Sequence, residues 1–588
     1  MRKMLAKEIF ILSSILITML AHPLLGRAQN DVYVYVLVLD GLDLQTFKEA
    51  LDSGGLPNIK RYFIKDGAFF EGVSLFPSAS NTVYQAVVSG LFPGHAGIPY
   101  LTWFNRKTKR PINYFTPNGQ RRLGRDILNL LTMLDEESSE DGLAPSTIFK
   151  MLGKDTLAIY SSFSGDANVR LPKNPLPALW AVFVKGKEEK LDEYAFHYLT
   201  RYISKENIPR FAMVGLYSSD ALGHHFGRGS PRVIENLKAF DERLGRFISL
   251  LKEKGIFEKT YIILLADHGM HNTPSSKLDL PSMIRSIGLT PYPGKDYNVY
   301  VSHRGIASAQ LYIRGKDGWE ARPSIGEMMH YPTKKGYINI IEELVRKGEI
   351  RFVVARNGYH NVEVFSKDGH ATITYSSAMG KRWYRYTDKD GDPLKIRGSN
   401  ARGMIGRFFD QETWGERLRD HIYPDAVVQL AQIFEDGKSG DIFVIPEQDY
   451  VFYRKKAATH GAIYREDMEI PVLMRGPGVK GGGGYIRPTD LFVEIASWFG
   501  MKVDIDHTDA GWRYRSSPIR HPSSYSTMPL DKMEVLAKRL KKLEEIRERL
   551  AKAAEREFGM RRDILVGNLL VLEEQIGRTG EDLKGALQ

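Results

Sequence analysis

The stretch VYVYVLVLD at Val32–Asp40, followed at once by Gly41, decides the fold of this chain. It is apolar, β-branched and aromatic, and it ends in a carboxylate. Because polar and apolar residues barely alternate in it, the stretch predicts a strand that is buried on both faces, as in the middle of a parallel α/β sheet.

Two further stretches have the same design. They are FAMVGLYSSD at 211–220 and YIILLAD at 261–267, and each ends in an aspartate. In open α/β sheets, ligands bind beyond the carboxyl ends of the strands. We therefore expect the carboxylates of Asp40, Asp220 and Asp267 to converge on one crevice, where they need cations.

The composition is that of a globular protein with two or more structural units, since 43% of its 588 residues are hydrophobic and 26% are charged. The sequence has no cysteine, which excludes a disulfide framework, a thiolate zinc site and a lipid anchor on cysteine. The net charge of +11 is only a weak indication of nucleic-acid binding, and we expect no nucleic-acid polymer as a partner. Attraction to anionic substrates or lipid head groups is equally compatible with it.

The first 28 residues have the pattern of a secretory signal peptide. Basic residues precede an apolar segment at 9–20, and Gly26-Arg27-Ala28 supplies small residues for cleavage. The apolar run is shorter than the roughly 20 residues that span a bilayer, which favours cleavage over an uncleaved membrane anchor. Export of a chain without cysteine fits a bacterial periplasm, or bacterial secretion, better than an animal secretory route.

The chain divides into a core, an insertion and a C-terminal extension. The core pattern covers 29–271 and returns at 437–504, beginning with a strand at 441–446. Between them, 272–436 is rich in Tyr, Val and Thr with Asn-Gly and Asp-Gly turns, which predicts an inserted, partly β cap of antiparallel hairpins. The pattern of 505–588 predicts a linker and a charged amphipathic helical hairpin that packs on the body, on a second copy or on a membrane surface.

Three aspartates and three histidines carry the chemistry that we expect of this chain. They are Asp40, Asp220, His224, Asp267, His268 and His460. Six such side chains are enough for two metal ions with three protein ligands each. Mixed His and Asp ligands suit zinc, with manganese or iron as the alternatives, and three ligands per ion leave positions open for catalysis.

The chain resembles the alkaline phosphatase superfamily, and within it the type I phosphodiesterase/nucleotide pyrophosphatase branch. The motifs that carry the resemblance occur in the family's order between about 33 and 500, and they are Leu39-Asp40-Gly41, Phe76–Ser80 with Ser89–Pro93, Asp220–Gly227, Asp267-His268-Gly269 and Thr459-His460-Gly461. The resemblance implies a three-layer α/β/α sandwich with a mostly parallel central sheet. The inserted α+β cap falls where the family places its insertions, and the C-terminal helical extension lies outside the family region.

The resemblance also implies how two zinc ions would be shared. One ion, beside the nucleophile, would be held by Asp40, Asp267 and His268. The other ion would be held by Asp220, His224 and His460.

The family's nucleophile stands nine residues before a Thr/Ser-Gly pair. Here that pair is Ser89-Gly90, which points to Ser80 as the nucleophile and to Ser78 as its structural neighbour. The resemblance therefore implies that zinc binds and activates the Ser80 hydroxyl and that a covalent phosphoserine intermediate forms.

One substrate-binding feature of the family is missing. The nucleotide pyrophosphatases carry an asparagine that binds a phosphoryl oxygen, and here Leu101 stands at that place. Asn81, Thr102 or Asn105 is expected to replace it, and nucleotide specificity is in doubt more than hydrolysis.

We expect an exported, metal-dependent hydrolase of small or lipid-linked phosphate esters, with phosphodiesterase/pyrophosphatase chemistry as the first expectation. A phosphomonoesterase, a phosphonate hydrolase or a transferase of phosphoryl head groups would use the same scaffold. The alternative from another class is a non-catalytic binding or scaffold protein on a degenerate phosphatase fold. Metal content would separate the two classes. The sequence leaves the oligomeric state open.

Overall fold

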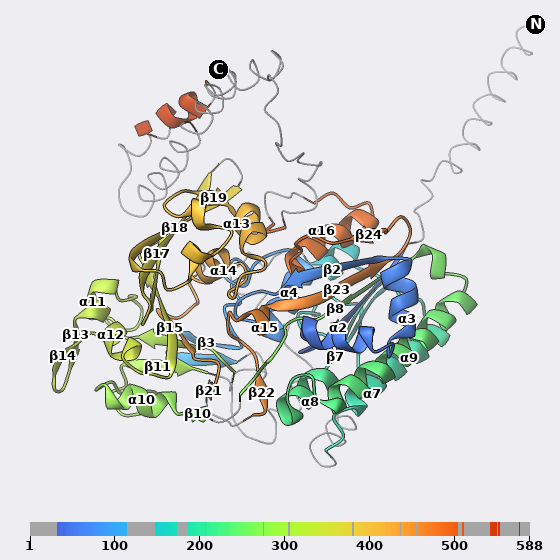
Figure 1. The fold of residues 1–588 in the computed structure, drawn as a ribbon, viewed down its shortest axis with the longest axis horizontal. Helices are drawn as coiled ribbons and strands as arrows, with labels where there is room; N and C mark the ends of the chain where they lie inside the picture. The colour runs from blue at the N-terminus through green and yellow to red at the C-terminus, as the bar shows by residue number, and fades with distance from the viewer. Residues whose placement is uncertain are drawn as a thin grey trace, which may run out of the picture.

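The computed structural model describes residues 32–113, 147–172, 186–205, 207–273, 276–303, 306–378, 381–435, 437–452, 456–503, 508–510, 541, 543–549, 551–552 and 576 (Figure 1). The expected signal peptide at 1–28 and most of the expected C-terminal hairpin lie outside the described residues. Among the described residues, no helix has the length and apolar content that crossing a bilayer requires.

An eight-stranded sheet forms the core, in the order β24-β2-β23-β8-β1-β7-β5-β6. Strand β1 (Tyr33–Leu39) pairs in parallel with β7 (Phe211–Leu216) and β8 (Thr260–Leu265), and all of β1 except Tyr33 is buried. This confirms the strand with two buried faces that the opening stretch predicts. The sheet also contains β2 (Ala68–Val73), β5 (Thr156–Ile159), β6 (Val169–Leu171), β23 (Glu469–Arg475) and β24 (Gly481–Gly482), of which β23 runs antiparallel to β8 and β2.

Helices cover both faces of this sheet, so the core is a three-layer α/β/α sandwich (Figure 1). On one face, α4 (Ser80–Ser89) packs against α5 (Ile148–Leu152) and α16 (Pro488–Trp498). On the other face, α9 (Pro231–Glu253) contacts α2 (Leu44–Asp52) and α7 (Lys190–Ser204). The predicted fold class is therefore confirmed.

The longest helix of this set, α9, shows why these residues form a helix. It begins where Pro231 follows the extended Ser230, which suits proline because the first helical N–H has no partner within the helix. Its buried apolar residues recur at helical spacing and form one stripe. They are Val233, Leu237, Phe240, Leu244, Phe247, Ile248 and Leu251.

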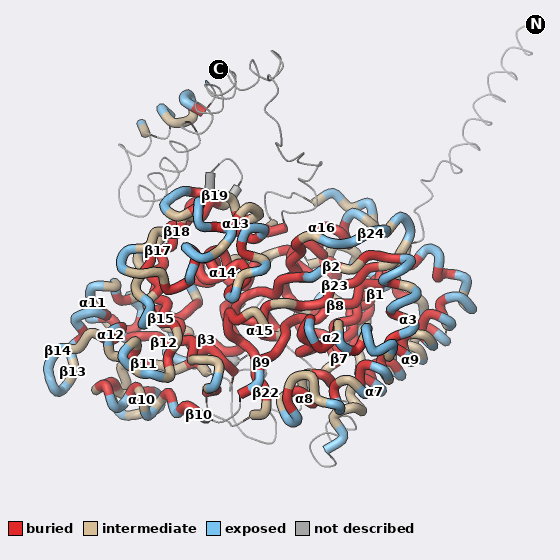
Figure 2. Tube along the Cα trace, in the orientation of Figure 1, coloured by how far each residue is buried: buried red, intermediate tan, exposed pale blue. Residues whose placement is uncertain are grey.

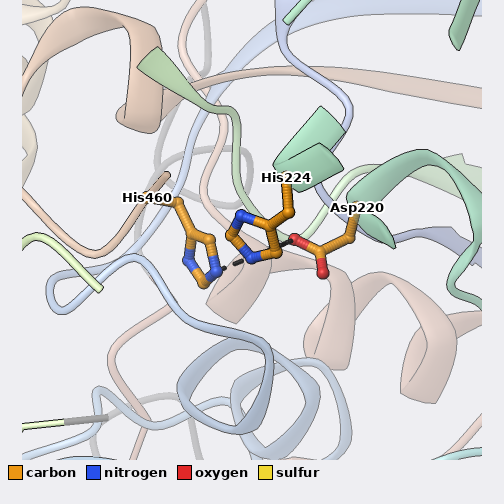
Figure 3. A group of neighbouring side chains, drawn as sticks. All are labelled: Asp220, His224 and His460. Atoms are coloured by element: carbon orange, nitrogen blue, oxygen red, sulfur yellow. Dashed lines mark ion pairs between the residues drawn. The ribbon is translucent and has the colours of Figure 1, made fainter. Parts of the chain in front are cut away.

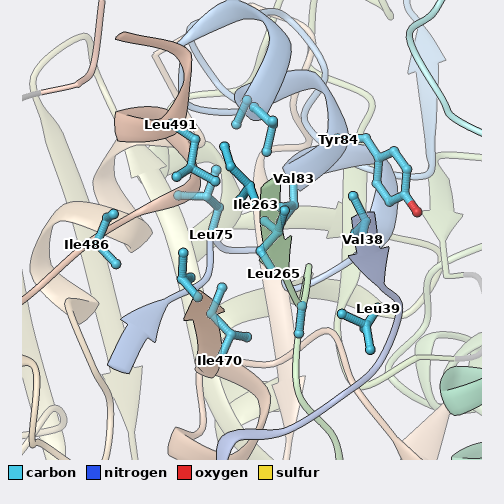
Figure 4. Close-up of a cluster of buried hydrophobic side chains, with 14 of the residues drawn as sticks. Val38, Leu39, Leu75, Val83, Tyr84, Ile263, Leu265, Ile470, Ile486 and Leu491 are labelled. Carbon is cyan, nitrogen blue, oxygen red and sulfur yellow. The ribbon is translucent and has the colours of Figure 1, made fainter. Parts of the chain in front are cut away.

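Apolar side chains fill the space between the sheet and the α4–α16 pair (Figure 4). Val38 of β1 and Ile263 of β8 are fully buried there, and Val83 of α4 and Leu491 of α16 pack in the same cluster. Burial follows the sheet, while the outer faces of the helices are exposed (Figure 2). Each buried aliphatic side chain contributes about 1.5–3 kcal/mol, so the strand ends are held on a rigid platform.

A second eight-stranded sheet, antiparallel throughout, forms much of the predicted cap, in the order β11-β12-β20-β15-β16-β17-β18-β19. The Asn357-Gly358 and Asp368-Gly369 turns join successive strands of it, as their turn signals predict. The strands are β11 (Val299–Ser302), β12 (Ala309–Ile313), β15 (Ile350–Asn357), β16 (Asn361–Ser366), β17 (Gly369–Ala378), β18 (Lys381–Gly391), β19 (Phe409–Asp410) and β20 (Ile442–Pro446).

Strand β20 departs from the expected division of the chain. It comes where the core was expected to resume, yet it pairs with β12 and β15 of the second sheet. All of its residues are buried, and an apolar run of this kind fits the middle of either sheet. The sequence pattern alone therefore does not choose between the two sheets.

Shorter elements connect the two sheets and their helices. The helical ones are α3 (Pro57–Ile59), η2 (Lys60–Lys65), α8 (Ser218–Phe226), η4 (Phe257–Lys259), α10 (Leu280–Ser286), α11 (Ile325–Met329), α12 (Ile340–Val345), η5 (Ile396–Gly398), η6 (Arg402–Met404), α13 (Gln411–Leu418), α14 (Ala426–Gln432) and α15 (Arg465–Met468). The strands are β3 (Thr102–Asn105), β4 (Arg110–Asn113), β9 (His271–Asn272), β10 (Ser276–Leu278), β13 (Tyr331–Thr333), β14 (Gly336–Ile338), β21 (Tyr450–Phe452) and β22 (Ala458–Thr459).

Candidate active site

A fully buried group of candidate metal-binding side chains lies at the carboxyl ends of β1 and β8. Asp40 directly follows β1, while Asp267 and His268 follow β8, and their ligand atoms lie within 4.8 Å of one another. His268 Nε2 is 3.5 Å from Asp40 Oδ1 and 3.7 Å from Asp267 Oδ2. We call these three residues the buried group.

Backbone amides orient the buried group. Asp267 Oδ1 accepts hydrogen bonds from the amides of Gly41 and His268, at 3.1 and 2.9 Å, so that Oδ2 remains for another partner. Gly41 has a positive φ of 70°, and a Cβ on it would lie 2.8 Å from the Cα and Cβ of Asp220. Glycine is therefore required where the turn after β1 approaches the second set of ligands.

The second set of ligands consists of Asp220, His224 and His460, and we call it the open group (Figure 3). Asp220 Oδ1 lies 3.4 Å from His224 Nε2 and 3.7 Å from His460 Nε2. The side chains of Asp220 and His224 are 22% and 18% exposed, whereas those of the buried group are at most 1% exposed. The rings of His460 and His268 stack at 3.7 Å, so the two groups are direct neighbours.

The local structure around Asp220 differs from the expected one. Strand β7 ends at Leu216, and Asp220 lies in helix α8 instead of at the strand end. Asp220 and His224 share one face of this helix because residues four apart lie one turn above each other. Gly223 is helical, and Met270 Sδ would lie 2.5 Å from a Cβ at this position.

Carbonyl groups set the orientation of all three histidines. The Nδ1 atoms of His224, His268 and His460 lie 2.8, 3.0 and 2.7 Å from the carbonyl oxygens of Ala458, Gly269 and Ser78. Each Nδ1 must therefore carry the proton and donate, which leaves a lone pair on each Nε2. This is the arrangement in which metal-binding histidines are usually held.

The residues present fit two metal ions. Within the described part of the chain, both carboxylate oxygens of Asp40, Asp220 Oδ1, Asp267 Oδ2 and His268 Nε2 are buried without a hydrogen-bond partner. Buried polar atoms rarely stay unpaired, so these five atoms are available to bind a cation. Ligand separations of 3.4–3.7 Å approach the roughly 3.3 Å that tetrahedral zinc with 2.0–2.1 Å bonds requires.

The electrostatics of the two groups favour the binding of a cation. Burial, followed by the charges of Asp267 and Asp220, raises the pKa of Asp40 well above its ordinary value. Burial likewise raises the pKa of Asp267, and it lowers the pKa of His224 to about 4. A divalent cation would stabilise the ionised carboxylates and the neutral imidazoles together.

Ser80 and Ser78 have different environments. Ser80 is the first residue of α4, is partly exposed, and its hydroxyl acts on Asp40 by lowering the pKa of that carboxyl. Ser78 is fully buried, and its Oγ donates to the Ala462 carbonyl and accepts the Gly461 amide. Ser80 therefore faces the buried group, while Ser78 holds the segment that carries His460.

The expected substrate-binding residues have other partners. Asn81 Nδ2 donates to the Tyr100 carbonyl, and the Thr102 hydroxyl pairs with that of Ser302. Asn105 Oδ1 accepts the amide of Thr108 within the β3–β4 hairpin. Asn81 Oδ1 is buried without a partner in the described structure, so of these three side chains Asn81 keeps an unpaired acceptor.

Lys456 is a further side chain at the open group, and no sequence pattern predicted it there. Its Nζ lies 2.9 Å from His224 Nε2, so an ammonium group reaches into the open group. The available signal was a basic run, Arg454-Lys455-Lys456, four residues before His460, and no metal-ligand or phosphate motif contains it.

Comparisons with known proteins identify the family. The family model for type I phosphodiesterase/nucleotide pyrophosphatase matches residues 34–466, which is most of the chain. A venom phosphodiesterase of Naja atra is 34% identical over 77 residues, which cover 13% of this chain and 9% of the relative. The bis(5'-adenosyl)-triphosphatase ENPP4 of Bos taurus is 25% identical over 244 residues, which cover 39% of this chain and 48% of the relative.

A solved structure is also similar. Murine ectonucleotide pyrophosphatase/phosphodiesterase 5, an inactive variant in complex with AMP, aligns over 80% of this chain and 96% of its own, with 12% identity and a TM-score of 0.48. The chain matches less than half of the length of the curated relatives named above.

Proposed function

The chain belongs to the type I phosphodiesterase/nucleotide pyrophosphatase family, and from this membership and the geometry of the site we propose that it hydrolyses phosphate esters with Ser80 as nucleophile. The observation that carries the proposal is the pair of adjoining ligand groups with a helix-terminal serine beside one of them. A buried charge cluster built for stability alone would leave fewer polar atoms unpaired.

Each residue has a defined part in the proposed reaction. The buried group and the open group would each hold one metal ion, with zinc favoured by the mixed carboxylate and imidazole ligands. The bound ions would supply a Lewis acid for the phosphoryl oxygens and would lower the pKa of the Ser80 hydroxyl. The carbonyls of Ala458, Gly269 and Ser78 keep the three imidazoles neutral at Nε2.

The covalent chemistry takes place at Ser80. Its Oγ forms a bond to phosphorus, the ester P–O bond breaks, and the alcohol or phosphate leaves. Water then cleaves the phosphoserine and restores the hydroxyl. Ser80 is suited to this role because it begins α4, where unpaired backbone N–H groups favour an anion.

The setting of the reaction is part of the proposal. We propose that the chain is exported through its N-terminal signal, residues 1–28, and acts on small or lipid-linked phosphate esters in a bacterial periplasm or outside the cell. Direct support for the substrate class comes from the family alone.

Ser80→Ala tests the proposal, with Ser78→Ala as the matched control. Ser80→Ala should abolish turnover of aryl phosphate diesters and monoesters while the protein keeps two metal ions per chain by elemental analysis. Ser78→Ala should keep turnover within about tenfold and lose roughly 1–3 kcal/mol of stability, because the buried Gly461 amide loses its acceptor. Full activity of Ser80→Ala would remove Ser80 from the mechanism.

A further inference from the structure

Lys456 is held next to the open group by its own backbone. Its carbonyl accepts a hydrogen bond from the Thr273 hydroxyl at 2.6 Å, and the amide of Ala457 donates to the His224 carbonyl at 2.9 Å. The neighbouring ladder between β22 and β9 fixes the segment that follows. The stem of Lys456 therefore starts from a fixed point beside His224, and its Nζ reaches the imidazole at 2.9 Å.

The contact between Lys456 and His224 is incompatible with a metal ion on the same atom. His224 Nδ1 donates to the Ala458 carbonyl, so Nε2 has a single lone pair, and the ammonium now takes it. When a metal ion takes that lone pair, Nζ has to turn away. Its flexible four-carbon stem allows this movement, but the anchored backbone keeps the ammonium close to the open group.

The charges of the site then call for an anion. The two groups contain three carboxylates, which carry three negative charges. Two divalent cations and the ammonium of Lys456 carry five positive charges, so the site has an excess of two positive charges. The anchored backbone keeps the displaced ammonium beside the open group, where its positive charge favours an anionic substrate. A phosphoryl group with two negative charges cancels the excess, whereas a phosphodiester, with one, leaves a positive charge over.

We propose that Lys456 binds a non-bridging oxygen of the substrate's phosphoryl group and biases the site toward dianionic groups, such as phosphate monoesters and terminal phosphates. This inference rests on the proposed function, because it needs both metal ions in place. It assigns Lys456 a role in positioning the substrate and in selecting it by charge. The covalent chemistry remains with Ser80.

Inorganic phosphate tests the inference without turnover. Calorimetry would measure phosphate binding to three zinc-loaded proteins: the wild type, Lys456→Met and the control Lys480→Met. Lys480 suits the control because it is exposed and distant in sequence from the ligands. Lys456→Met should bind phosphate about tenfold more weakly or worse, since a charge-assisted hydrogen bond is lost. Its zinc content should stay at two per chain, and Lys480→Met should match the wild type in both measurements.

Steady-state kinetics on an aryl phosphate monoester and a diester supply the second readout. Lys456→Met should lose more kcat/KM on the monoester than on the diester, and Lys456→Arg should restore part of the difference. Unchanged phosphate affinity, equal losses on the two esters, or loss of zinc from Lys456→Met would each overturn the inference. Failure of the proposed function would show instead as full activity of Ser80→Ala, and the phosphate titration would still decide the role of Lys456.

Discussion

Two of the buried clusters of ionisable side chains in the described structure handle charge in opposite ways. The buried group at the candidate metal site has carboxylates with raised pKa values and several polar atoms without hydrogen-bond partners in the described structure. The second cluster consists of His95, Arg382, Glu435 and Asp509. Its two carboxylates have lowered pKa values, because the positive charges of His95 and Arg382 outweigh the effect of burial.

The second cluster pairs its own charges, although His95 Nε2, Glu435 Oε1 and Asp509 Oδ1 form no hydrogen bond in the described structure. The two ring nitrogens of His95 lie 2.7 Å from Asp509 and 2.9 Å from Glu435, and Arg382 contacts both carboxylates. Asp509 also accepts a hydrogen bond from the amide of Phe92, just beyond α4. The comparison teaches that burial alone does not indicate a functional site. A cluster whose chain supplies its own counter-charges connects parts of the fold, whereas a cluster short of positive charge is built to take up a cation.

The largest expected effect tests whether the buried group binds a metal ion. Asp267→Asn should cost more activity than the roughly 10–100-fold that loss of a supporting residue causes, because we propose that the Asp267 carboxylate itself binds a metal ion. Elemental analysis should find less zinc in this variant, and zinc should raise its Tm less than it raises that of the wild type. An Asp267→Asn protein with full zinc content and full activity would contradict the assignment of the buried group.

The second effect tests the self-neutralised cluster. Asp509→Asn should destabilise the protein by roughly 3–5 kcal/mol, because it leaves buried positive charge on His95 and Arg382 without its partner. Zinc content should stay unchanged, as measured on the folded protein below its transition in a urea titration. The exposed Asp449 offers a control, and Asp449→Asn should unfold at the wild-type urea concentration. A loss of zinc in Asp509→Asn would mean that the two clusters are coupled and do not act separately.

The smallest effect is a pH dependence of the same cluster. Burial and Arg382 act to lower the pKa of His95, but Asp509 and Glu435 outweigh them and raise it to about 9. Because the folded pKa lies above the unfolded value of about 6.5, this stabilisation is complete below about pH 6.5 and is lost as the pH rises toward 9. The loss should be on the order of 3 kcal/mol.

Urea unfolding of the wild type and of His95→Gln between pH 6 and pH 10 measures that contribution as a difference. The variant should be less stable at pH 6, and the gap between the two proteins should narrow as the pH rises. A gap that stays constant over the whole range would mean that His95 is not charged in the folded protein.

Local pattern made much of the fold predictable, and it also predicted that the candidate ligands come together. The apolar run of β1 ends in Asp40, and that of β8 leads to Asp267 and His268, because parallel strands deliver their carboxyl ends to one edge of the sheet. Asp220 was placed in the site for a partly wrong local reason, since it lies in α8 rather than at the end of β7. The spacing to His224 still put both side chains on one face of a helix turn.

By itself, the sequence determined which segments become buried strands and which acids and histidines lie at their ends, since hydrophobic periodicity and chain order are local properties. Only the tertiary structure decided which oxygens stay unpaired, which nitrogen of each histidine faces the other candidate ligands, and where Lys456 reaches. Those features depend on contacts between residues far apart in the chain, such as His460 with the Ser78 carbonyl, 382 positions away, and His95 with Asp509, 414 positions away. No local pattern encodes them, because packing of the whole core brings the partners together.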